Sequence, residues 1–142
     1  MALADDFQVV VDSADPHTQA DWWAETLDWQ VEPSDEAFIK EMVAKGFAGE
    51  DDTKHHNGTL VWKMGAAIRH PSTQQRVLFQ VVPEGKTVKN RLHLDVRVGA
   101  DNQEAEHEKL LGRGASFLHR GQQGPYRWIT MADPEGNEFC IT

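Results

Sequence analysis

The sequence predicts an α+β fold built from two βαβββ repeats, and three observations indicate it. The first is a β-rich run, Phe7–Asp12, followed at once by the helix-start signal Asp15-Pro16. The second is the same order of strand and helix beginning again at Arg91. The third is a set of strand candidates, separated by glycine and proline, after each helix. Two such curved halves can enclose a shared cavity, and cavities of this kind commonly bind small molecules.

The first half, at about residues 5–83, begins with that strand and continues into a helix. Asp15 is the expected N-cap, and Pro16 stands at the first helical position, where its missing N–H costs no hydrogen bond. An apolar helical face follows from the spacing of Ala20, Trp23, Ala24 and Leu27. Further strands are expected at 29–32, 59–63, 66–69 and 76–82.

Residues 34–58 read as an insertion in the first half. Ser34 is the expected cap of a short helix in which Phe38 and Met42 pair at i, i+4, and Gly46 is its expected end. The acidic stretch 49–58 is expected to be a solvent-exposed loop. Its His55-His56 pair is a possible metal cluster, but a solvated loop is the favoured interpretation. The reason is that adjacent histidines point in different directions on most backbones.

The second half, residues 91–142, follows a lysine-rich linker at 84–90. Its first strand is expected at 91–98. Asp101 and Glu104 have the spacing of a capping box for a helix that runs to about Leu111. Three more strands are expected at 115–119, 126–132 and 137–142.

Composition excludes several classes of function. The net charge of −9 argues against nucleic acid and anionic membranes as partners. No apolar run approaches the ~20 residues that a membrane-spanning helix needs, and the N-terminus has no basic signal region. A single cysteine, Cys140, fits a reducing compartment. We expect one cytoplasmic domain over residues 1–142.

Three segments carry a resemblance to a known family. They are Ala14-Asp15-Pro16 with Trp22-Trp23, the run Lys89–Asp95, and the terminal segment Asp133–Thr142. Together they resemble the vicinal-oxygen-chelate superfamily, glyoxalase/bleomycin-resistance type, and most closely its small actinobacterial-type glyoxalase-like domain proteins. The resemblance spans nearly the whole chain apart from 34–58. It implies two βαβββ halves forming curved mixed sheets around a central cleft, and it is compatible with a homodimer.

The resemblance also implies positions for metal ligands, one on the first and one on the last strand of each half. Mapped by position these are Gln8, Gln80, His93 and Cys140. The family usually has glutamate at two of them, where this chain has Gln80 and Cys140. Amide oxygens are weak ligands, and a thiol must lose its proton to bind metal. We therefore expect no cofactor, and a divalent Zn, Ni, Mn or Fe ion is the alternative.

Several side chains are candidates for lining a ligand pocket. Trp62 and Trp128 lie on predicted strands, although packing in the core explains them equally well. Glu138 shares the strand face of Cys140 by the period-two alternation and is a substitute carboxylate. His93 and Cys140 also have plain interpretations, as a hydrogen-bonded histidine and a small buried apolar group.

The sequence thus predicts a glyoxalase-like protein that binds a small molecule through a neutral polar cluster, without a complete metal site. The alternative is a divalent-metal-dependent lyase, isomerase or dioxygenase that acts on a small carbonyl compound, where the metal would offset developing negative charge. A third interpretation, an interaction module without activity, requires an exposed apolar patch.

Overall fold

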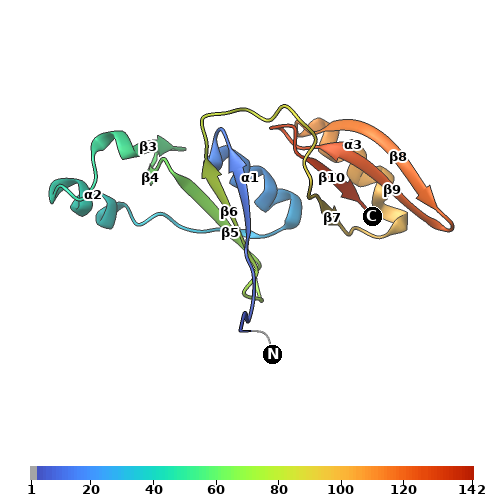
Figure 1. The fold of residues 1–142 in the computed structure, drawn as a ribbon, viewed down its shortest axis with the longest axis horizontal. Helices are drawn as coiled ribbons and strands as arrows, with labels where there is room; N and C mark the ends of the chain where they lie inside the picture. Colours follow the sequence, from blue (N-terminus) through green and yellow to red (C-terminus); the bar gives the residue numbers. More distant parts are fainter. Residues whose placement is uncertain (1–2) are drawn as a thin grey trace. The chain divides into compact units, whose positions relative to one another are not determined.

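The computed structural model describes residues 3–142, and its contacts divide the chain into two compact units on either side of Pro83. We call residues up to Pro83 the first unit and residues from Glu84 the second unit. Each unit contains one four-stranded sheet with a helix packed on one face (Figure 1). No helix within the described residues is both long and apolar enough to cross a membrane.

The sheet of the first unit has the strand order β1-β6-β5-β2. Its elements are β1 (Val9–Ser13), α1 (Pro16–Leu27), β2 (Gln30–Val31), β5 (Gly65–Arg69) and β6 (Arg76–Val81). β1 runs parallel to β6, and the other two pairings are antiparallel. Helix α1 packs against β5 and β6, so that Ala20, Trp23, Ile68 and Phe79 are buried.

The start of α1 confirms the prediction from Asp15 and Pro16. Asp15 Oδ2 accepts a hydrogen bond from the Thr18 hydroxyl at 2.8 Å, and Pro16 is the first helical residue. Burial raises the pKa of Asp15, but the hydrogen bonds from Thr18 outweigh it, so the pKa lies below its usual value. The helix ends where Asp28 adopts the left-handed conformation, with φ of 56°.

The inserted segment differs from the prediction in two places. Helix α2 (Glu36–Ala44) is capped by Asp35, whose side chain accepts from the Phe38 N–H at 3.0 Å. Ser34 is not the cap because its hydroxyl donates to the Leu60 carbonyl at 2.6 Å.

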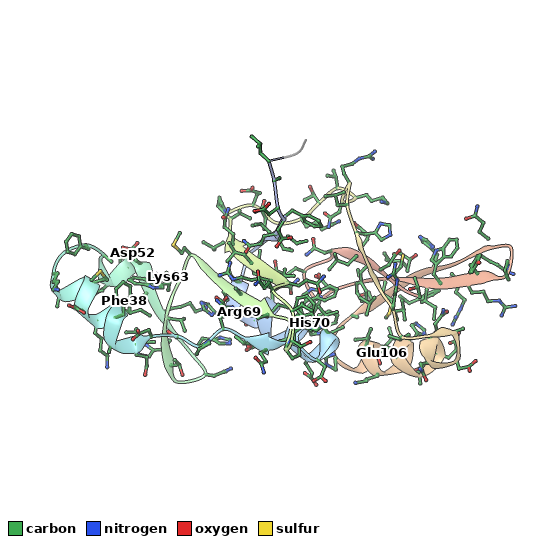
Figure 2. The ribbon with its side chains drawn as sticks, turned by 90° about the horizontal axis from the view of Figure 1, so that it is seen from below. Phe38, Asp52, Lys63, Arg69, His70 and Glu106 are labelled. Atoms are coloured by element: carbon green, nitrogen blue, oxygen red, sulfur yellow. The ribbon has the colours of Figure 1, made fainter. Side chains whose placement is uncertain are left out.

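The stretch expected to be an exposed loop is in fact a 3-10 helix, η1 (Glu50–Asp52), and a strand, β3 (Thr53–His56). β3 forms a separate two-stranded hairpin with β4 (Thr59–Trp62). The turn is Asn57-Gly58, with φ of 50° and 82°, and this pair is a strong hairpin signal in sequence. The Lys63 N–H donates to the Asp52 carbonyl at 2.9 Å and closes the hairpin's base (both residues labelled in Figure 2).

The second unit repeats the topology of the first. Its elements are β7 (Leu94–Val96), the 3-10 helix η2 (Ala100–Asn102), α3 (Gln103–Gly112), β8 (Ser116–Gln123), β9 (Tyr126–Ala132) and β10 (Glu138–Ile141). The strand order β7-β10-β9-β8 matches that of the first sheet, with first and last strands again parallel. Leu110 of α3 is fully buried, as are Met131, Phe139 and Ile141 of the sheet. The predicted α+β fold with two βαβββ repeats is confirmed.

Two details of the second half differ from expectation. The predicted capping box is replaced by other contacts: Asn102 donates to the Val98 carbonyl at 2.8 Å, and Glu104 forms an ion pair with Arg120. The first strand is also shorter than predicted, since β7 begins at Leu94 and His93 lies just before it.

Candidate functional site

The second unit brings a histidine, an aspartate and the cysteine together on the face of its sheet that points away from α3. Cys140 on β10 lies directly opposite Asp95 on β7, and His93 is two residues before Asp95 on the same side. His93 Nε2 lies 3.2 Å from Asp95 Oδ1. One ligand atom from each of the three residues lies within 4.8 Å of the others. Sequence mapping had selected His93 and Cys140 but missed Asp95, although it stands in the quoted Lys89–Asp95 run.

The same face continues across β9 and β8. Thr130, opposite Cys140, has its hydroxyl 3.4 Å from the Cys140 sulfur, and both side chains are buried. Trp128 pairs with Gly121, and a Cβ placed on Gly121 would fall 2.1 Å from the Trp128 ring. The indole therefore lies flat across the glycine, and only glycine admits it there. Trp128 is half-buried in this position.

Glu138 has a structural role in the second unit. It accepts hydrogen bonds from Lys86 Nζ and from the Asn90 N–H, both at 2.8 Å, and thereby fastens residues 86–90 to β10. Burial raises the pKa of Glu138, but the hydrogen bonds from Lys86 and Asn90 hold it below its usual value. With both oxygens engaged in this way, Glu138 is poorly placed to replace a missing metal-binding carboxylate.

Gln8 and Gln80 lie in the first unit, on the sheet face that points away from α1. The Gln8 oxygen accepts a hydrogen bond from Arg76 Nη1 at 3.0 Å. A permanently cationic guanidinium on the only acceptor atom of Gln8 competes with a metal ion for that atom. Gln80 is exposed on β6, opposite Asp12 on β1 and Gly65 on β5. This half of the implied ligand set therefore fits a divalent cation poorly.

A cleft of about 520 Å³ lies within the first unit. Its apolar lining includes Val31, Val61, Ala67, Leu78 and the predicted pocket residue Trp62. These side chains come from β2, β4, β5 and β6, so the hairpin of the inserted segment supplies one side of the cleft. Its volume falls in the range of sites that take small organic molecules.

One polar group in the lining of this cleft, the arginine end, is a carboxylate shared by two arginines. Glu32 accepts hydrogen bonds from Arg76 Nε at 2.6 Å and Nη2 at 3.0 Å, and from Arg69 Nε at 2.5 Å. The hydrogen bond from Arg76 holds the pKa of Glu32 below its usual range despite burial, and Arg69 adds to the effect. The same pairing raises the pKa of Arg76. Glu32 and Arg76 both line the cleft and their charges cancel, whereas Arg69 does not line it.

A second polar group in the lining, which we call the imidazole end, consists of two imidazoles and a carboxylate. His17 and Asp21 belong to α1, one turn apart, and His56 is the last residue of β3. His56 Nε2 lies 2.6 Å from Asp21 Oδ2, and His17 Nε2 lies 2.7 Å from the Trp62 carbonyl oxygen. The two rings have centroids 5.3 Å apart and are tilted by 34° to each other. Sequence reasoning weighed His56 as part of a possible metal cluster and favoured a solvated loop, and it did not select His17, Asp21, Glu32 or Arg76.

Comparison with known families decides the classification. The sequence model of the glyoxalase-like domain family matches residues 8–142. The chain belongs to this family. A comparison with curated proteins finds no match.

Solved structures with the same fold include an antibiotic-resistance protein and an antibiotic-binding protein. A fosfomycin resistance protein from Listeria monocytogenes superimposes with a TM-score of 0.64 at 8% identity, over 99% of this chain and 93% of its own. The bleomycin-binding protein of Streptomyces verticillus, complexed with copper(II)-bleomycin, gives 0.55 at 15% identity, over 100% and 98%. A glyoxylase/bleomycin resistance protein/dioxygenase domain from Frankia gives 0.59 at 15%, over 99% and 97%. These likenesses confirm the predicted fold, and the family match over residues 8–142 confirms the predicted family resemblance.

Proposed function

We propose that this protein binds a small organic molecule without a metal ion, and that the cleft of the first unit is the binding site. The observation that carries the proposal is the cleft itself: an apolar lining that includes an indole, with polar groups gathered at two ends. Apolar walls supply affinity, and a few fixed polar groups supply orientation. The part of the implied metal set that lies in this unit, Gln8 and Gln80, offers neutral amides, one of them engaged by Arg76.

Structural relatives support the same conclusion at the level of ligand class. One is a bleomycin-binding protein and another is a fosfomycin resistance protein, and both antibiotics are small molecules. Because a fold hosts many functions, this support concerns the kind of ligand and not its identity.

Thermal unfolding of metal-free protein tests the proposal. A library of small aromatic and aliphatic compounds is added after treatment with a chelator, since a ligand of the native state raises the melting temperature. We expect hits whose effect disappears in Trp62→Leu and persists in Trp128→Leu, a matched change in the other unit. Hits that survive Trp62→Leu and disappear in Trp128→Leu would place the site elsewhere.

A second candidate function, metal-dependent chemistry on a carbonyl compound, is favoured by one observation. His93, Asp95 and Cys140 offer a nitrogen, an oxygen and a sulfur ligand atom within 4.8 Å of one another. This mixture suits Zn²⁺, provided that Cys140 loses its proton. A bound ion would act there as a Lewis acid, while His93 and Asp95 would fix its position.

Elemental analysis after soaking in Zn²⁺, Ni²⁺, Mn²⁺ or Fe²⁺ tests this candidate. One equivalent per chain that disappears in Asp95→Asn, and remains in the exposed control Asp101→Asn, would establish the site. Protein that stays metal-free after every soak would remove metal-dependent catalysis through these residues.

We also propose that the protein is a cytoplasmic homodimer. The cytoplasmic location rests on the single reduced cysteine and the acidic composition. The dimer is supported by large apolar side chains left in solvent, among them Phe7, Val88 and Leu92, each more than three-quarters exposed. Analytical ultracentrifugation checks the dimer: a single species at the monomer mass would contradict it.

A further inference from the structure

The imidazole end of the cleft has a hydrogen-bonding polarity that selects a ligand. We infer that this end accepts a hydrogen bond from a hydroxyl group carried on an aromatic ring, so that the cleft takes phenol-type molecules. This inference rests on the proposed function, because it names the ligand class of the same cleft.

The partner of His17 fixes the tautomer of its ring. Its Nε2 lies 2.7 Å from the Trp62 carbonyl oxygen. A carbonyl oxygen can only accept, so Nε2 carries the proton and donates it. In the neutral ring the other nitrogen, Nδ1, is then an acceptor. His17 is 9% exposed and lines the cleft.

The partner of His56 leads to the same result. A carboxylate also only accepts, and Asp21 Oδ2 lies 2.6 Å from His56 Nε2, so that nitrogen is the donor. Asn57 Nδ2 lies 3.3 Å from the same nitrogen and would favour the opposite tautomer by donating to it. The shorter contact, with a full negative charge, decides the proton position. In the neutral ring Nδ1 of His56 is therefore an acceptor too.

His17 and His56 both line the cleft, so a ligand bound beside their rings meets two acceptors and gains a hydrogen bond by supplying a donor. A hydroxyl donates one hydrogen, whereas an ether or a carbonyl offers only lone pairs against lone pairs. A ring suits the remainder of the cleft, because Trp62 and the two imidazoles are themselves flat and aromatic.

The imidazole end is less suited to binding a metal ion than to hydrogen bonding with a ligand. Among residues 3–142, the one group that brings three ligand atoms within 4.8 Å is the His93 group in the second unit. His17 and His56 have each committed one nitrogen to an oxygen acceptor, so the pair is arranged as hydrogen-bonding side chains.

The test compares two probes that differ by one methyl group. 4-Cyanophenol can donate a hydrogen bond, and its methyl ether, 4-methoxybenzonitrile, cannot. Equilibrium dialysis of the full chain should show the phenol binding about tenfold more tightly than the ether, as expected for one well-formed hydrogen bond. In Asp21→Asn the side-chain amide can donate to Nε2 and move the ring proton to Nδ1. The preference for the phenol should then disappear, while the exposed control Asp12→Asn retains it.

The possible outcomes separate this inference from the proposed function. If both probes bind the native protein equally, the hydroxyl preference is wrong and small-molecule binding stands. If neither binds, the cleft does not take a phenol-type ring and this inference falls, while the proposed function is still decided by the thermal-unfolding screen. Nitrogen-15 NMR of the histidine rings provides a check that does not depend on a variant. A resonance pattern with the His56 proton on Nδ1 would overturn the inference directly.

Discussion

Replacement of Glu32 by glutamine is expected to destabilise the first unit. Most of the lost stability should come from the weakened contact with Arg76 and little from the contact with Arg69. Glu32 joins three strands, because it follows β2 and binds Arg69 of β5 and Arg76 of β6. Glutamine has the same size but carries no charge. The substitution therefore removes the charge-assisted character of the hydrogen bonds while leaving the packing nearly unchanged.

The magnitude follows from the exposure of each pair. Arg76 makes two hydrogen bonds to Glu32, and their side chains are 31% and 21% exposed, so the loss is about 1.5 to 3 kcal/mol. The Arg69 side chain is 64% exposed, and a solvated ion pair contributes ~0.2 to 1 kcal/mol. Double-mutant cycles should therefore give a coupling free energy for Glu32 and Arg76 that clearly exceeds the one for Glu32 and Arg69.

Urea unfolding as a function of pH measures both the size and the sign of the effect. The pKa of Glu32 in the folded protein lies below its ordinary value of 4.5. The stabilisation is therefore complete above pH 4.5 and is lost as the pH falls through the folded pKa. The difference between native protein and Glu32→Gln should be constant at neutral pH and shrink in acid. A difference that does not depend on pH, or equal coupling to both arginines, would refute the reasoning.

Two further predictions concern the second unit. His107→Leu should raise the free energy of unfolding in urea by about 1 to 2 kcal/mol. The reason is that, within residues 3–142, both ring nitrogens of this buried histidine lack a hydrogen-bond partner. A loss of stability would show that the imidazole forms hydrogen bonds in solution. Gly121→Ala should cost about 1 to 3 kcal/mol and shift the fluorescence of Trp128 towards that of an exposed indole, because the new methyl would overlap the ring. The control is Gly112→Ala, where the added methyl meets nothing within 4 Å; equal effects of the two substitutions would contradict the contact.

Most of the fold was predictable because its signals are local. Asp15 and Pro16 mark a helix start whatever surrounds them, and the doubled order of strand and helix gave the topology. The first error occurred where one side chain could form either of two hydrogen bonds. Ser34 is as good a cap as Asp35 in sequence, but its hydroxyl is engaged by Leu60, 26 residues away. The hairpin in the acidic stretch was missed because charge was weighed above the Asn57-Gly58 turn signal.

The cleft was less predictable, because its polar ends are assembled from distant segments. His17 is 39 residues from His56, and Glu32 is 44 residues from Arg76, so neither pair leaves a spacing that a motif could reveal. Trp62 was selected as a residue of the right type on a strand, and it does line a cleft. Asp95 is different: it alternates with His93 on one face of its strand, and period-two reasoning would have included it.

The measurement that tests the central claim most directly is fluorine NMR of protein labelled with 5-fluorotryptophan. The chain has five tryptophans, and Trp62 and Trp128 are assigned by replacing each with phenylalanine. Small aromatic compounds are then titrated into metal-free protein. Binding in the cleft of the first unit predicts a saturable shift of the Trp62 resonance with Trp128 unmoved. A saturable shift of Trp128 alone, with Trp62 unmoved at saturation, would contradict the account.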